Sequence, residues 1–133
     1  MLVSIGRYEI CDGTLAGGVA VSDLRVVGDR LYEFAVPVGD GGDPVMFDRI
    51  TTTTDLTFTV KRTFANKPTC EKFILQLDTI LPSTGTVTFT TTGPSPVTRV
   101  IPNGFVLDHS LVGEYGATAW HQYHIIGGPP VAP

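Results

Sequence analysis

Hydrophobic and polar residues alternate along most of the chain, and this pattern predicts β-strands. It is clearest over residues 55–64, where threonines separate apolar residues that share one face: Leu56, Phe58, Val60 and Phe64. A period of two is that of a half-buried strand, and Thr and Val favour a pleated surface. The same pattern predicts strands at 2–10, 21–27, 31–38, 86–92, 97–101, 105–112 and 118–126.

The connections between these segments predict how some of them pair. Residues 21–27 and 31–38 flank a short link that contains glycine, which favours a hairpin. We expect 86–92 to pair with 55–64. The segment 39–44, GDGGDP, has the composition of an exposed loop.

One segment has a different period and predicts the only helix, at about 69–81. Its apolar residues recur at spacings of three and four and form one stripe: Cys70, Phe73, Ile74, Leu77, Ile80 and Leu81. Pro68 fits the first turn of this helix, and Pro82 ends it. Since there is no second helix to receive the stripe, it must lie on a sheet.

These elements predict a mainly β (α+β) fold, an antiparallel β-sandwich or partly open barrel with one amphipathic helix. At 133 residues the chain has the size of a single domain, 1–133. Residues 127–133, GGPPVAP, are expected to be a flexible C-terminal tail.

Charge and hydropathy exclude several classes of function. The net charge is −4, and the nine Lys and Arg residues are scattered, which disfavours binding to nucleic acid. No apolar run approaches the roughly 18 residues that a membrane span needs. The first residues alternate like a strand and lack the features of a signal peptide, so we expect a cytoplasmic protein.

The candidate metal ligands do not form a site in the predicted strands. His121 and His124 point to opposite faces, and His109 shares with Phe105, Leu107 and Leu111 a face that should be largely buried. The acidic loop residues Asp40, Asp43 and Asp48 do not have EF-hand spacing and are expected to be solvated. Cys11 and Cys70 are far apart in sequence and are expected to be reduced, buried thiols.

No arrangement of residues indicates catalysis. Ser110 follows His109 and Asp108, but neighbouring residues of a strand point to opposite faces and cannot form a triad. The other serines, Ser4, Ser22, Ser83 and Ser95, have no nucleophile-elbow context, and there is no nucleotide-binding glycine motif. We therefore expect no enzyme activity, no cofactor, no metal and no small-molecule substrate.

The C-terminal strands carry large apolar residues on both faces, so both faces need cover. In a strand, Phe105 and Leu107 would point to one face and Val106 to the other. Trp120 and Tyr123 would likewise point to opposite faces. A partner subunit would cover the surplus. The helix lying over the outer face is an equally good interpretation.

The segment RTFANKPTCEKFILQLDTILPSTGTVTFTT, interpreted as strand, helix and strand, and YHIIGG near the end carry a resemblance. In element order the chain resembles the small β-sandwich proteins with one helix that build bacteriophage tails, and their relatives in contractile-injection and type VI secretion systems. It is short for a tube subunit, so a connector, completion or accessory virion protein fits equally.

The resemblance implies a structural protein of a phage or prophage tail that self-associates into rings through sheet edges and the loops near 39–48. Its partners would be copies of itself and other tail or connector proteins, and it would reside in the virion after synthesis in the host cytoplasm. The alternative is a monomeric β-sandwich that binds a carbohydrate or protein through an aromatic patch of Phe47, Trp120 and Tyr123.

Overall fold

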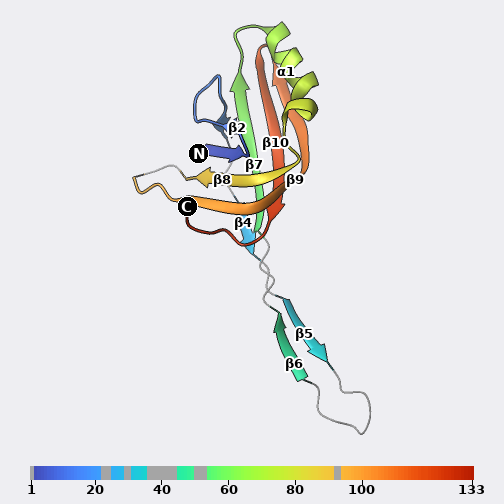
Figure 1. Cartoon of the computed structure of the whole chain (residues 1–133). Helices are drawn as coiled ribbons and strands as arrows, with labels where there is room; N and C mark the ends of the chain where they lie inside the picture. The colour runs from blue at the N-terminus through green and yellow to red at the C-terminus, as the bar shows by residue number, and fades with distance from the viewer. Residues whose placement is uncertain (1, 22–24, 29–30, 36–44, 50–53, 92–93) are drawn as a thin grey trace.

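The computed structural model describes the backbone of residues 2–21, 25–28, 31–35, 45–49, 54–91 and 94–133, and the side chains of those that lie outside 22–53. The chain forms, in order, β1 (Leu2–Ile5), β2 (Tyr8–Cys11), β3 (Val19–Ala20), β4 (Arg25–Gly28), β5 (Leu31–Ala35), β6 (Val45–Arg49), β7 (Thr54–Thr63), α1 (Lys67–Ile80), β8 (Thr84–Thr90), β9 (Thr98–Tyr115) and β10 (Thr118–Gly127) (Figure 1).

The main sheet is antiparallel and has the strand order β2-β1-β8-β9-β10-β7-β3, with β4 also paired to β7. In Figure 1, β8 and the first part of β9 run across the direction of β7 and β10. The sheet thus bends over itself without closing. The helix α1 lies beside β10 and the second part of β9, at the open end of the bent sheet. This arrangement confirms the predicted fold class, a mainly β protein with a partly open antiparallel sheet and one helix.

The bend lies within β9, which is one strand of 18 residues. Residues 98–105 of β9 pair with β8, and residues 105–115 pair with β10. Gly104 stands at the change of partner, where a Cβ atom would lie 2.4 Å from Cγ2 of Val87. Only a glycine lets the two strands approach so closely there.

The core lies between the two halves of the bent sheet and under the helix. Its members come from β1, β2, β7, β8, β9, β10 and α1 with its C-cap: Val3, Ile5, Ile10, Cys11, Leu56, Phe58, Val60, Leu77, Leu81, Val87, Phe89, Ile101, Tyr123 and Ile125. The rings of Phe58 and Tyr123 stack with their centroids 5.6 Å apart. The predicted inward positions within β7 and β8 are therefore confirmed, whereas Phe64, predicted to share the buried face, lies just beyond β7 and is half-buried.

The helix begins earlier than the sequence predicts, at Lys67, because Asn66 caps it. The Asn66 side-chain oxygen accepts the backbone N–H of Thr69 at 2.9 Å, and Pro68 occupies the first turn, as expected. The stripe faces the core through Cys70, Leu77 and Leu81. Ile80, predicted to belong to the stripe, is instead 42% exposed, because it lies at the end of the last turn.

Three predictions about strands are wrong. Residues 2–10 form two strands, since Gly6 adopts a left-handed turn with φ of 58°. The predicted strands at 97–101 and 105–112 are one continuous strand, β9. The segments 21–27 and 31–38 do not form a hairpin, because β4 pairs with β7 and β5 pairs with β6.

The predicted pairing of 86–92 with 55–64 is also wrong. The strand in the first segment, β8, lies between β1 and β9, and β7 pairs with β10 instead. The alternation of apolar and polar residues specifies which face of a strand is buried, and it carries no information on the neighbouring strand.

The predicted tail, residues 127–133, begins with Gly127, the last residue of β10, and Val131 forms two backbone hydrogen bonds with Val100 of β9, of 2.7 and 2.9 Å. The flexibility of this segment stays a prediction. The acidic loop 39–44 and the side chain of Asp48 lie outside the described residues. The predicted solvation of Asp40, Asp43 and Asp48 therefore stays a prediction.

Candidate assembly surface

The histidines of β10 lie on opposite faces of the strand, as predicted. His121 is only 4% exposed and shares the inner face with Tyr123 and Ile125. The edge of its ring meets Phe73 of α1, with centroids 5.9 Å apart. Burial, together with the smaller effects of the nearby His109 and Arg62, lowers the pKa of His121 to about 4. This imidazole is therefore neutral near pH 7.

His124 faces outward between two carboxylates. Its Nε2 lies 2.5 Å from Oδ1 of Asp55 on β7, and its Nδ1 lies 3.7 Å from Oδ2 of Asp108 on β9. The three side chains link three adjacent strands across the outer face of the sheet. Within the part of the chain that the structure describes, no three or more His, Cys, Asp or Glu side chains are arranged to hold a metal ion.

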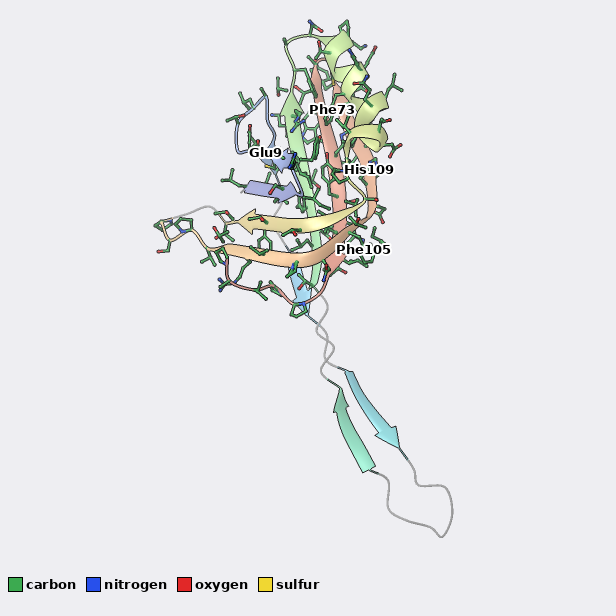
Figure 2. All side chains as sticks on the ribbon, viewed as in Figure 1. Glu9, Phe73, Phe105 and His109 are labelled. Atoms are coloured by element: carbon green, nitrogen blue, oxygen red, sulfur yellow. The ribbon has the colours of Figure 1, made fainter. Side chains whose placement is uncertain are left out.

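His109 connects β9 to the helix. Its Nε2 lies 2.5 Å from Oδ1 of Asp78, and Figure 2 shows His109 beside α1. An open cavity of about 420 Å³ adjoins this contact, and it is lined by Asp78, Leu81, Pro82, Ser83, Val106, Leu107, Asp108 and His109. The neighbouring residues of β9 separate as expected: Ser110 is exposed, and Asp108 and His109 contact different elements, so they form no triad.

The prediction that Phe105, Leu107 and Leu111 lie on a largely buried face is wrong. They are 40%, 52% and 41% exposed. The pairing with β10 skips position 107 and position 112, so β9 carries two bulges. A bulge reverses the alternation of faces. Val106 packs on the core instead, and Phe105 pairs with Ile126.

The surface that follows from these bulges is the β9 edge, which we define as residues 107–115 on the side away from β10. Its strand neighbour on that side, β8, ends its pairing at Phe105, and the last backbone hydrogen bond there joins Val106 N–H to the Ser83 oxygen. Among the described residues, no strand pairs with the β9 edge beyond that point. Its exposed apolar residues are Leu107, Leu111, Val112 and Tyr115.

The other strands at the edges of the sheet, as far as the structure describes them, are each shorter than the β9 edge. The strands β2 and β4 have four residues each, and β3 has two. Short edge strands, Lys and Pro are the usual means by which proteins keep sheet edges from pairing with other chains. The β9 edge is nine residues long and has neither Lys nor Pro, and its charged residues are Asp108 and Glu114.

The aromatic patch of the alternative hypothesis does not form. Tyr123 is buried on the inner face, while Trp120 lies on the outer face, where the Lys61 ammonium is 5.7 Å from its ring centroid. Alternation along one strand separates the two rings. The Phe47 side chain is outside the described residues.

Both cysteines are buried and form no disulfide, as expected. Cys11 donates a hydrogen bond to the Gly18 oxygen at 3.0 Å. Burial, with the charges of Glu114 and Glu71, raises the pKa of Cys70, which leaves its thiol protonated and unreactive.

The sequence does not reveal the β9 edge or the pairing of Asp78 with His109. Both depend on where β8 stops and where β9 bulges. The segment IPNGF at 101–105 carries the one usable signal, because proline and glycine inside a strand indicate a bend or an irregularity.

No family model and no curated protein matches the chain. The structure is similar to the cryo-EM structure of the anti-feeding prophage cap (AFP tube terminating cap), with a TM-score of 0.44 and 11% sequence identity over 98% of this chain and 85% of that chain. A likeness at this level carries no weight for function. Of the helices described, none has the length and apolar character that crossing a membrane requires.

Proposed function

We propose that the chain is a non-enzymatic structural subunit that self-associates into rings and belongs to the tail of a bacteriophage or prophage particle. Its partners are other copies of the chain and other tail or connector proteins. It binds no nucleic acid by sequence, no membrane and no small-molecule substrate, and it needs no cofactor.

The observation that carries this proposal is the β9 edge. Unpaired backbone groups and exposed apolar side chains along one strand are a template for another strand. Burying Leu107, Leu111 and Val112 against a second chain removes apolar surface from water, and the added strand satisfies the open N–H and C=O groups. An assembly in which each edge meets a neighbour is stable, and a ring closes it.

The assignment to a tail rests on the order of strand, helix and strand around α1 and on the acidic balance of the chain. A net charge of −4 suits a conduit through which DNA passes without adhering. The protein is then made in the host cytoplasm and resides in the virion.

The test is the mass of the protein in solution by light scattering, over a range of concentrations and salt. We expect an oligomer, and Val112→Lys at the β9 edge should weaken assembly by at least about tenfold in concentration, which corresponds to about 1.4 kcal/mol. Leu75→Lys is the matched control, because Leu75 is 81% exposed on α1 and is not part of the β9 edge. A protein that stays monomeric under all conditions, also with its genomic neighbours co-expressed, contradicts the proposal.

A further inference from the structure

A second element of the structure lies apart from the main sheet. Among the described residues, β5 and β6 pair only with each other and form a separate two-stranded sheet. In Figure 1 this hairpin lies beyond the end of the main sheet. A two-stranded hairpin alone is marginally stable in water. Apart from Glu33, Asp48 and Arg49, the residues of its strands are apolar or aromatic, so the hairpin requires a further strand and cover.

The hairpin is on the wrong side of the sheet to reach the β9 edge of its own chain. The chain leaves the sheet after Gly28 and returns at Thr54, and these two residues pair with each other. They lie at the β4 and β7 side of the sheet, whereas the β9 edge is separated from β7 by β10. A hairpin that fills this edge therefore comes from a second copy.

We propose that β6 of one copy adds as an antiparallel strand to the β9 edge of the next copy. This inference rests on the proposed self-association and names its contact. In the register we propose, position 49 lies beside position 108, position 46 beside 111 and position 45 beside 112. Each copy donates one hairpin and offers one edge, which is the head-to-tail contact that closes into a ring.

Charge and the placement of apolar residues favour the antiparallel direction and this register. The start of the β9 edge is acidic: Asp78 and Asp108 both line the open cavity and are 86% and 68% exposed at their side chains. The incoming strand VMFDR carries its one cation at the end, at Arg49. The antiparallel direction brings this arginine to the end that holds two carboxylates and brings the apolar positions Val45 and Met46 to Leu111 and Val112, whereas the parallel direction would bring it towards the single carboxylate of Glu114.

Charge reversal tests the contact directly. Arg49→Asp and Asp108→Arg should each raise the concentration for half assembly by at least about tenfold. The two changes combined in one chain should restore it to within about threefold of the unchanged protein. Arg99→Asp is the control, since Arg99 is exposed on the first half of β9. Circular dichroism and unfolding curves check that every variant is folded. Loss without restoration in the double variant overturns the contact.

Cross-linking tests the register. Copies with Met46→Cys mixed with copies with Leu111→Cys should form an intermolecular disulfide, because facing positions of antiparallel strands lie within its reach. The native Cys11 and Cys70 are buried and give little background. Met46→Cys mixed with Leu75→Cys should not cross-link. If Arg49→Asp assembles normally and the Met46–Leu111 cross-link does not form, the proposed contact is wrong but self-association still holds, and β4 is the next edge to test. A protein that is strictly monomeric contradicts both the contact and self-association.

Discussion

Leu77→Ala is the sharpest test of how α1 is held on the sheet. The Leu77 side chain is fully buried in the core and lies in the middle of the apolar stripe. Truncation removes three carbon atoms and leaves a cavity that the bent sheet cannot refill, because its halves are fixed by strand pairing. The expected cost is about 3 kcal/mol, within the range for buried leucines.

This cost is large against a total stability of about 5–15 kcal/mol. In a chain of this size it should lower the melting temperature by roughly 10 °C. Urea unfolding followed by circular dichroism at low protein concentration gives the free energy of unfolding without a contribution from assembly. Leu77→Asp should prevent stable folding altogether, since it buries an unpaired carboxylate.

Leu75→Ala is the matched control, with the same change of side chain on the same helix. Leu75 is 81% exposed, so its truncation should alter the free energy of unfolding by less than about 0.5 kcal/mol. Equal losses for Leu77→Ala and Leu75→Ala would show that the stripe does not face the core and would refute the packing of α1 described above.

Three further predictions test the fold at other points. The free energy of unfolding should fall by up to about 3 kcal/mol as the pH drops from 6.5 towards 4, because His121 is protonated in the unfolded chain and neutral in the folded one. His121→Leu should reduce this dependence of the free energy on pH in urea titrations, and an unchanged dependence contradicts the buried neutral imidazole. Gly127→Ala should cost about 1–3 kcal/mol, since its Cβ would lie 2.4 Å from Cγ2 of Ile101, whereas Gly128→Ala meets nothing within 4 Å and should be nearly neutral in thermal melts. Asn66→Ala should cost about 1 kcal/mol through loss of the helix cap and Asn66→Asp should retain it; equal melting temperatures for the two would exclude the cap.

The sequence predicts the buried faces of this fold well and the partners of its strands poorly. The apolar residues of β7 and β8 are buried as their period of two requires, and α1 lies within two residues of its predicted start. Periodicity reports the local environment of each strand, while pairing depends on distant segments. The predicted hairpin of 21–27 with 31–38 is wrong for this reason. The strand β4 pairs with the distant β7, through Val27 with Asp55 and Gly28 with Thr54.

The single helix and the open β9 edge have the same structural origin. The ladder of β8 and β9 pairs Thr84 with Phe105, and if β8 extended towards the N-terminus in this register, position 82 would face Leu107 and position 74 would face Tyr115. Those positions belong instead to Pro82 and to α1. Pro82 has no N–H to donate to a ladder. Burial of the apolar stripe, at Cys70 and Leu77, places the helix on the inner face of the sheet. The segment that would have covered the edge is thus used to cover the core, and in the contact proposed above another molecule supplies the strand that completes the sheet.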